Sequence, residues 1–288
     1  MGSKVAVSIG MPVYNGSKSL RTALDSLLSQ TFTDFELIIS DNDSNDETEI
    51  ICREYVNQDK RIRYIRQKTN IGAMPNFQFV LDNATGEYFM WASHDDYWHE
   101  DFIVKNLDNL SKDVRAVGSI GNVLLCNKNG REKRSGADNS IIGTKFERLK
   151  NFIIYPNDNS RFYSLFKKRA LEELNLNKYN FHASDWFVTF KILLHGNLLN
   201  INETLLKRHE QETNHYAKQL KEDNKNYITF GLPLIPLTIN IIRSIPIYYT
   251  IFLANKLYKL NRFQYKLYQM ILFGKKMNSI EFKNMNIS

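Results

Sequence analysis

Two adjacent carboxylates, Asp95 and Asp96, closely follow an apolar segment, residues 88–92, that is rich in strand-forming side chains. Polar residues at a strand end are typical of ligand sites in α/β sheets. Two neighbouring carboxylates are unfavourable unless a positive charge lies beside them, and Mg²⁺ or Mn²⁺ completed by substrate phosphates is the natural candidate. The alternative is that one of the pair caps a helix beginning near Tyr97. The sequence favours the metal and the phosphate.

The elements that would position this pair alternate between strands and helices. Apolar, β-rich segments predict strands at residues 4–11, 35–40 and 88–92, and an alternating pattern predicts a strand at 61–66. Helical spacing predicts helices at 19–30, 47–55 and 75–83. This order predicts a mostly parallel sheet with covering helices and a site at the carboxyl ends of its strands. Further along the chain we expect strands at 114–126, 161–166 and 198–206 and a helix at 146–154.

Three of the predicted strand ends carry polar or acidic clusters that could converge on one ligand. They are Tyr14-Asn15, residues 41–46 and the Asp95-Asp96 pair. The first strand is followed by neither a GxGxxG nor a GxxxxGK[ST] motif, so dinucleotide and P-loop binding are not indicated. A nucleotide held by carboxylates and a metal ion remains.

Composition indicates an ordinary globular protein of 288 residues, enough for one large domain and an appendage. The two cysteines, Cys52 and Cys126, form no metal or disulfide pattern and suit a reducing compartment. The first residues are polar and do not resemble a signal peptide. We therefore expect a cytoplasmic protein.

The basicity of the chain is concentrated near its end. Residues 224–280 contain eight Lys or Arg and no Asp or Glu, whereas residues 1–223 carry a net charge of −1. A basic, apolar tail points to a membrane surface rather than to nucleic acid. Its longest uncharged stretch, residues 226–242, includes two prolines and is at the lower limit for a spanning helix. A membrane span is therefore not expected.

Within this tail, residues 255–276 have the pattern of an amphipathic helix. Its apolar side carries Leu253, Leu257, Leu260, Leu267 and Ile271. Cations lie largely opposite, at Lys256, Lys259, Arg262 and Lys266. Two interpretations are open. Either the helix lies in the interface of an anionic membrane, or its apolar side packs on the body of the protein or on a partner subunit.

Taken together, several short motifs resemble the family-2 glycosyltransferases of GT-A fold over roughly residues 4–215. They are Pro12-Val13-Tyr14-Asn15, Ser29-Gln30-Thr31-Phe32, the acidic loop 41–46, Asn70-Ile71-Gly72, Ala84-Thr85-Gly86-Glu87-Tyr88 and Asp95-Asp96. Each is weak alone, and their order and spacing are specific. The resemblance implies an α/β fold with a mixed, mostly parallel sheet and a helical C-terminal extension. It also implies a bacterial-type glycan or polysaccharide enzyme that transfers a sugar from a nucleoside-diphosphate sugar with inversion at the anomeric carbon.

The resemblance also implies roles for individual residues. Those expected to bind the donor nucleotide are Pro12, Val13, Tyr14, Asn15, Asp41, Asn42, Asn70, Gly72, Asp95 and Arg208. Asp96 is the implied ligand of Mn²⁺ or Mg²⁺. His209 could equally be a second ligand or a surface residue. His94 is expected to pack or hydrogen-bond locally rather than serve as a third ligand. Family members often have two consecutive acids where this chain has Asp41-Asn42. UDP is still the expected nucleotide, but because Asn42 offers both a donor and an acceptor, the base preference is open.

Asp185 is the remaining candidate. It falls in the first turn of a predicted helix that runs to His195 and stops at Gly196. One interpretation is that the acid stabilises the helix dipole. The other, implied by the resemblance, is that Asp185 is the general base that takes the proton of the acceptor hydroxyl. The sequence context favours the base.

The expected organisation is a catalytic domain, residues 1–223, followed by a helical tail, residues 224–288. Residues 1–110 form the nucleotide-binding half and residues 111–223 the acceptor half. The expected acceptor is a glycan or a lipid-linked saccharide. If the tail binds lipid, the protein would be located at the inner face of the cell membrane. Whether the chain forms a homo-oligomer is left open. Two alternatives compete. The first is a nucleotidyltransferase, but the first strand is not followed by a phosphate-binding loop. The second is a catalytically silent glycan-binding or assembly relative, but Asp95, Asp96 and Asp185 are all present.

Overall fold

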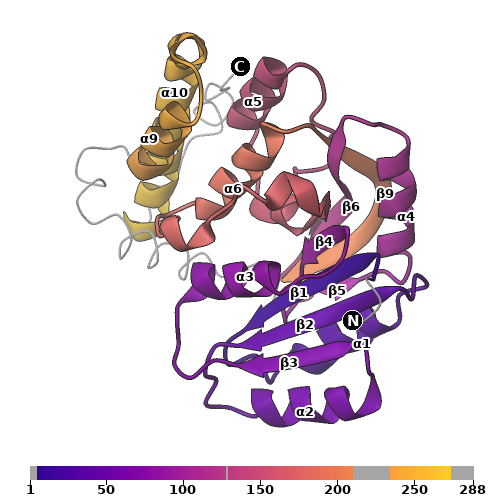
Figure 1. Cartoon of the computed structure of the whole chain (residues 1–288). Helices are drawn as coiled ribbons and strands as arrows, with labels where there is room; N and C mark the ends of the chain where they lie inside the picture. The colour runs from indigo at the N-terminus through magenta and orange to yellow at the C-terminus, as the bar shows by residue number, and fades with distance from the viewer. Residues whose placement is uncertain (1–4, 128, 210–233, 274–288) are drawn as a thin grey trace.

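The structure, a computed structural model, describes residues 5–127, 129–209 and 234–273. A mixed β-sheet runs through the molecule (Figure 1). Its first half consists of four parallel strands in the order β3-β2-β1-β4. They are β1 (Val7–Val13), β2 (Phe35–Asp41), β3 (Ile62–Arg66) and β4 (Tyr88–Trp91). Val7 of β1 pairs with Phe35 on one side and with Tyr88 on the other. The predicted parallel arrangement is confirmed, and the loops after β1, β2 and β4 meet at one edge.

The second half of the sheet is mixed. After β4 the order is β8-β6-β9-β5, with β7 paired to β6. The bounds are β5 (Tyr97–Trp98), β6 (Ala116–Cys126), β7 (Glu132–Arg134), β8 (Leu165–Lys167) and β9 (Asn197–His209). The two-residue strand β5 pairs antiparallel with the end of β9, Tyr97 opposite Lys207. This pairing brings the residues after β4 beside the last residues of β9.

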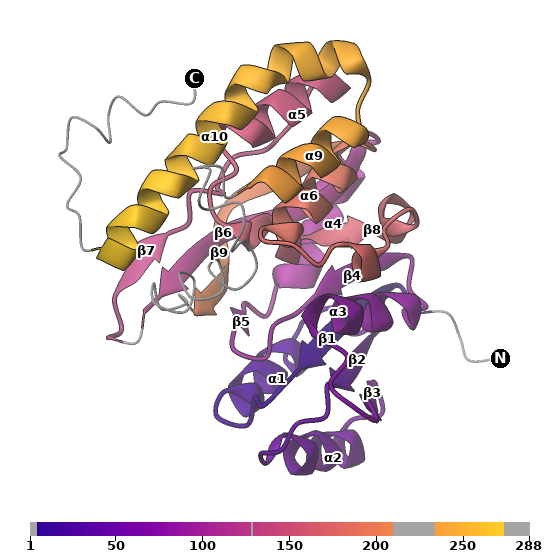
Figure 2. The same ribbon diagram turned by 90° about the vertical axis from the view of Figure 1, so that its left-hand side faces the viewer.

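Helices cover both faces of the parallel half. They are α1 (Leu20–Leu28), α2 (Thr48–Gln58) and α3 (Ala73–Asp82), whereas α4 (Phe102–Ser111) packs on β6, β9 and β8 of the mixed half. In α1 the buried residues Leu20, Ala23, Leu24 and Leu27 recur at helical spacing. Figures 1 and 2 show α1 and α3 on opposite faces of β1 and β2.

Two local expectations were wrong. No helix begins near Tyr97, because this residue lies in β5 and α4 begins only at Phe102, so neither Asp95 nor Asp96 is a helix cap. The predicted strand 161–166 is mostly the 3₁₀-helix η1 (Asn159–Tyr163), followed by β8. Asp158 caps η1 by accepting a 2.8 Å hydrogen bond from the Ser160 N–H. Two further 3₁₀ turns are η2 (Lys168–Leu171) and η3 (Leu176–Lys178).

The C-terminal half adds the helices α5 (Lys145–Ile154), α6 (Ser184–Leu193), α9 (Ile235–Arg243) and α10 (Ile247–Phe273). Helix α9 contacts α6, and α10 contacts α5 and α9 (Figure 2). Leu253, Leu257 and Leu260 are buried in the core. For these residues the structure supports packing on the body over contact with lipid. Among the described residues, no helix is long and apolar enough to cross a membrane. The other parts of the predicted tail, residues 224–233 and 274–288, lie outside the described range, as do the side chains of Leu267 and Ile271.

Candidate functional site

The loop after β2 is organised by a carboxylate that faces inward. Asp41 is completely buried. It accepts hydrogen bonds from the Ser44 N–H at 2.8 Å and the Tyr64 hydroxyl at 2.7 Å, and Arg66 lies at 3.4 Å. With both carboxylate oxygens engaged by protein groups, Asp41 holds this loop in place. Contact of Asp41 with the nucleotide stays a prediction.

Asn42 links this loop to the start of α3. Its amide donates to the Asn70 side-chain oxygen at 3.0 Å and the Gly72 carbonyl at 3.2 Å, and its oxygen accepts from the Ile71 N–H at 2.8 Å. An aspartate here could not make the two donations. Gly72 has a φ of 89°, which favours glycine. The structure therefore brings Asn42, Asn70 and Gly72 together, with the Asn42 amide occupied by protein partners, and their contact with the nucleotide stays a prediction.

The loop after β1 lies beside the β2 loop. The Asn42 N–H donates to the carbonyl of Val13 at 2.8 Å, and the Asn15 side-chain oxygen accepts from the Asn45 N–H at 2.9 Å. Pro12 and Val13 are buried at the end of β1, whereas the Tyr14 ring is exposed at 46%. Of the four residues predicted in this segment, Tyr14 is the one whose side chain can stack on a base.

The acidic pair lies between β4 and β5, and its two members differ in environment. Asp95 is half-buried and its carboxylate accepts a hydrogen bond from Ser93. Asp96 is buried, with 3% exposed. Its Oδ2 lies 3.1 Å from Arg208 Nε, and its Oδ1 accepts from the His209 N–H at 3.1 Å. Burial raises the pKa of Asp96, and the guanidinium of Arg208 opposes that rise. His94, as expected, makes a local contact, with Ser19 at 3.3 Å.

Arg208 is the centre of this network. Besides Asp96, its Nη1 donates to the side-chain oxygen of Asn159 at 2.7 Å, and its guanidinium lies 4.2 Å from the Tyr163 ring centroid. The carboxylate of Asp96 raises the pKa of Arg208 against the effect of burial. The fold supplies these partners because Phe162, between Asn159 and Tyr163 in sequence, stacks on Trp91 of β4.

Asp185 joins the same network from the first turn of α6. Asn159 donates a side-chain hydrogen bond to it, and the Trp186 N–H donates at 2.8 Å. The helix begins after Ala183, whose φ of 61° lies in the left-handed region, a conformation that is unfavourable for alanine. Burial raises the pKa of Asp185. A carboxylate with a raised pKa is suited to act as a general base.

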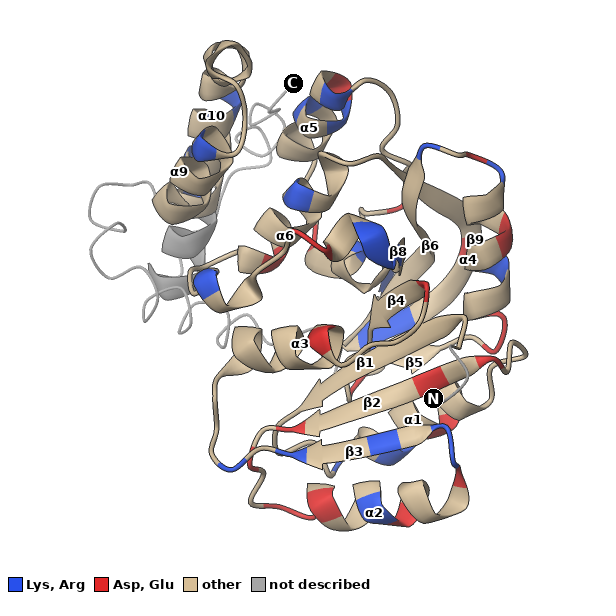
Figure 3. Cartoon of the chain, viewed as in Figure 1, with Lys and Arg blue, Asp and Glu red and all other residues tan. Residues whose placement is uncertain are grey.

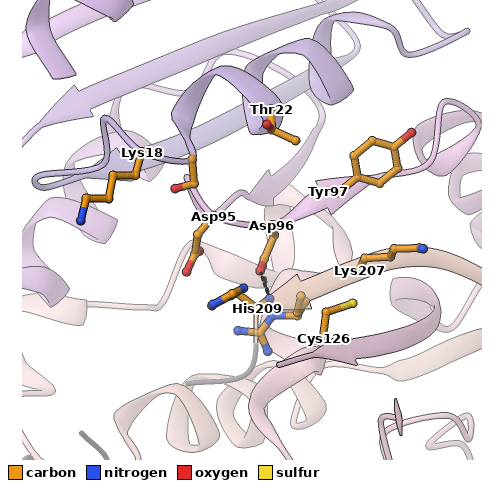
Figure 4. A pocket seen from close by; sticks show the side chains of 10 residues that line it. Lys18, Thr22, Asp95, Asp96, Tyr97, Cys126, Lys207 and His209 are labelled. Carbon is orange, nitrogen blue, oxygen red and sulfur yellow. Dashed lines mark hydrogen bonds and ion pairs between the residues drawn. The ribbon is translucent and has the colours of Figure 1, made fainter. Parts of the chain in front are cut away.

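A pocket of about 330 Å³ opens beside the acidic pair. Its walls come from the start of α1, the β4–β5 loop, and the ends of β6 and β9. The lining residues are Lys18, Ser19, Thr22, Asp95, Asp96, Tyr97, Cys126, Lys207, Arg208 and His209. In Figure 4 the side chains of Asp95 and His209 point toward the same space, with Asp96 beside them. Carboxylates facing several cations make this pocket suited to a metal-bound or a free diphosphate.

Comparison with known proteins decides the family. Residues 8–175 match the family described as Glycosyl transferase family 2, which is more than half of the chain. The chain belongs to this family.

Individual members share parts of the sequence. An uncharacterised glycosyltransferase of Rickettsia typhi is 38% identical over 106 residues, which cover 37% of this chain and 32% of that protein. The Campylobacter jejuni GalNAc(5)-diNAcBac-PP-undecaprenol beta-1,3-glucosyltransferase is 27% identical over 192 residues, 64% of this chain and 60% of that protein. The matches thus span about a third to three fifths of these relatives.

Solved structures of similar fold confirm the GT-A architecture. TarS 1-349 of S. aureus in complex with UDP-GlcNAc superposes with a TM-score of 0.61 at 16% identity, covering 92% of this chain and 90% of that one. The mannosyltransferase PcManGT of Pyrobaculum calidifontis, in complex with GDP-Man and Mn²⁺, gives 0.55 at 14% identity, covering 98% and 79%. The predicted GT-A fold with a helical C-terminal region is therefore correct.

A divalent cation, which this family implies, fits one side of the acidic pair better than the other. Within the described ranges, no three His, Cys, Asp or Glu side chains are grouped as a ready ligand set. Both oxygens of Asp96 are taken, whereas Asp95 lines the pocket together with the His209 imidazole. One or two carboxylates are enough for Mg²⁺ when substrate phosphates complete its coordination. Asp95 is therefore the better placed first ligand, and Asp96 reaches the ion only if Arg208 releases it.

The family motifs do not include every residue that the structure brings to the site. Asn159 connects Arg208 with Asp185, and Lys18 lines the pocket from the turn before α1. Neither residue stands in a motif with a spacing rule. Lys18 could have been found as a cation directly after the Tyr14-Asn15 turn. Asn159 had no signal, because its place depends on a 3₁₀ turn that the sequence did not reveal.

Proposed function

We propose that this chain transfers a sugar from a nucleoside-diphosphate sugar to a hydroxyl of a glycan or lipid-linked saccharide, with inversion at the anomeric carbon. The observation that carries the proposal is the chain of contacts from Asp96 through Arg208 and Asn159 to Asp185. It holds a candidate base and a phosphate-binding cation at one site. UDP-sugars are the first candidate donors.

The chemistry follows from these positions. Asp185 accepts the proton of the acceptor hydroxyl while that oxygen forms a bond to the anomeric carbon. The bond from this carbon to the donor phosphate breaks on the opposite side, and its electron pair leaves with the diphosphate. Arg208 and Lys18 offset the negative charge that develops there. When bound at Asp95, with Asp96 and His209 as further candidate ligands, Mn²⁺ or Mg²⁺ would supply additional neutralisation of the leaving group.

The relatives support the substrate classes. One fold neighbour was crystallised with UDP-GlcNAc and another with GDP-Man and Mn²⁺. The C. jejuni relative is named for transfer to an undecaprenol-linked saccharide. A lipid-linked acceptor would bring the enzyme to the inner face of the cell membrane. No observation favours a nucleotidyltransferase.

A donor-turnover assay tests the proposal. The full chain is incubated with UDP-, GDP- and TDP-sugars with Mn²⁺, and released nucleotide and pyrophosphate are quantified. We expect a nucleoside diphosphate from one donor class, faster with added glycan acceptors. Release of pyrophosphate would indicate a nucleotidyltransferase, and no release with any donor would indicate a silent relative. NMR of the product's anomeric configuration then tests inversion.

A further inference from the structure

The first turns of α10 expose a group of large apolar side chains. Ile247, Ile251 and Phe252 are 73%, 71% and 70% exposed, and Tyr248 is 54% exposed. Apolar side chains in such a contiguous group, rather than scattered singly, mark a surface that meets something other than water.

This part of α10 is anchored to the body, so the exposure does not come from a loosely attached helix. Leu253 and Leu257, on the opposite side, are buried in the core. Asn261 accepts from the Leu234 N–H at 2.8 Å and donates to the Thr238 hydroxyl at 2.8 Å, which fixes α10 to α9. The ring of Phe146 from α5 lies 5.1 Å from that of Tyr249.

Cations continue the exposed face toward the helix end. Positions 248, 251, 255, 259, 262 and 266 follow one another at intervals of three or four, so they share one side of α10. That side begins with Tyr248 and Ile251 and ends with Lys259, Arg262 and Lys266. Residues 234–273 contain five Lys or Arg and no Asp or Glu, and Figure 3 shows blue without red on both α9 and α10.

We propose that this face of α10 binds the surface of an anionic bilayer. Ile247, Tyr248, Ile251 and Phe252 enter the boundary between headgroups and acyl chains, and the cations that follow lie over lipid phosphates. This exposed face lies opposite the leucine side of α10. The sequence pattern had left contact with lipid open for the leucine side. The proposal extends the proposed function, since α10 flanks the side toward which β1 and β2 end (Figures 1 and 2), where a lipid-linked acceptor would have to arrive.

A second copy of the chain fits this surface less well. A symmetric dimer would place the same patch on both subunits. Two such helices would bring like charges at Lys259, Arg262 and Lys266 together without carboxylates from either α10. Like charges across an interface are unfavourable. An anionic lipid surface presents negative charge along the whole face.

Vesicle flotation tests the proposal on the full chain. Vesicles of phosphatidylcholine alone are compared with vesicles containing about 30% phosphatidylglycerol, at low salt and at about 0.5 M salt. We expect binding to the anionic vesicles that is lost at high salt. The double variant Ile251→Ser/Phe252→Ser should bind at least about tenfold more weakly. Arg262→Glu should weaken binding by about fivefold or more.

Matched controls keep the test decisive. Ile50→Ser changes another well-exposed isoleucine, on α2 and 60% exposed, and should float like the unaltered chain. Donor turnover in solution should be unchanged in all variants, which separates failure of this proposal from failure of the proposed function. Flotation that is absent, or equal for the double variant and the unaltered chain, would overturn the proposal. If light scattering also showed that only the double variant is monomeric, the face would be a dimer contact instead.

Discussion

Arg208 connects acidic side chains that are far apart in the sequence. Its side chain is 10% exposed and that of its partner Asp96 is 2% exposed. A buried ion pair of this kind contributes little net stability, because both groups lose hydration, but removing one partner leaves an uncompensated charge. The pair is better explained by its effect on geometry: Asp96 orients the Arg208 side chain toward Asn159 and keeps the guanidinium beside the pocket.

Replacing Arg208 should therefore be costly for folding as well as for activity. Arg208→Ala leaves the Asp96 carboxylate buried with only the His209 N–H as partner. We expect the free energy of unfolding, measured by urea denaturation, to fall by about 3–5 kcal/mol. Lys112→Ala is the control, because Lys112 and Asp108 form an exposed pair, each 64% exposed, and we expect no measurable change there. Equal effects of the two substitutions would contradict the buried pair.

The raised pKa of Asp185 predicts the pH dependence of transfer. A general base must be deprotonated, and burial raises its pKa above the ordinary aspartate value of 3.8. The rate should be constant above the raised pKa and fall tenfold per pH unit below it. A kcat profile measured downward from neutral pH checks this. An acid limb at or below 3.8, in an enzyme shown to stay folded there, would rule out the raised pKa.

At the scale of elements, the sequence predicted the strands that local patterns determine. It missed β5, which depends on pairing with a distant strand. Strands β1, β2 and β4 follow from runs of mostly apolar residues that are buried on both faces, and β3 follows from its alternating pattern. β5 could not be predicted, because two residues become a strand only by pairing with β9, about 110 positions later, with His209 bonded to Asp96. The same long-range contact decides whether Asp96 is a helix cap or a site residue.

Helix α10 shows the same division. Its amphipathic pattern was visible, but whether the leucine side faced lipid or protein was not, because the pattern is the same in both cases. The partners α5 and α9 decide it.

A pair of substitutions on α10 tests this assignment. Leu257→Ala creates a cavity in the core, since Leu257 is 2% exposed, and should lower the free energy of unfolding by about 2–5 kcal/mol. Phe252→Ala removes a larger side chain from the exposed side and should cost much less. Both are measured by urea denaturation without lipid. A larger loss for Phe252→Ala would mean that the faces are exchanged.

For the whole molecule, the order of strands and the family motifs were enough to predict the fold, and the location of the site at the strand ends stays a prediction. They could not show how each side chain is held. Asp41 was predicted to contact the nucleotide, and the structure shows its carboxylate bonded to Tyr64, Arg66 and Ser44. Such partners come from β3 and from the loop's own backbone, and a motif does not encode them.

Metal assistance can be tested on the whole protein through ligand-dependent stability. A ligand that binds only the folded form raises the Tm, by the equivalent of about 2.7 kcal/mol at a hundred times its Kd. We expect UDP to raise the Tm more with Mn²⁺ than with a chelator. Asp95→Asn should abolish the Mn²⁺-dependent part, and Asp108→Asn, at an exposed carboxylate of α4, should leave it intact. Equal shifts with and without Mn²⁺ would speak against a metal at Asp95.

Asp185 is proposed as the base of the sugar transfer, separate from the residues proposed to bind the donor. The most direct measurement compares Asp185→Asn with the unaltered chain in both donor binding, by calorimetry with the active nucleotide sugar, and transfer rate. We predict nearly unchanged donor affinity, a fall in kcat of about 10²–10⁴-fold, and a Tm at neutral pH no lower than before, because the half-buried carboxylate that is removed has a disfavoured charged form. A variant that binds the donor and still transfers at the full rate would contradict the account.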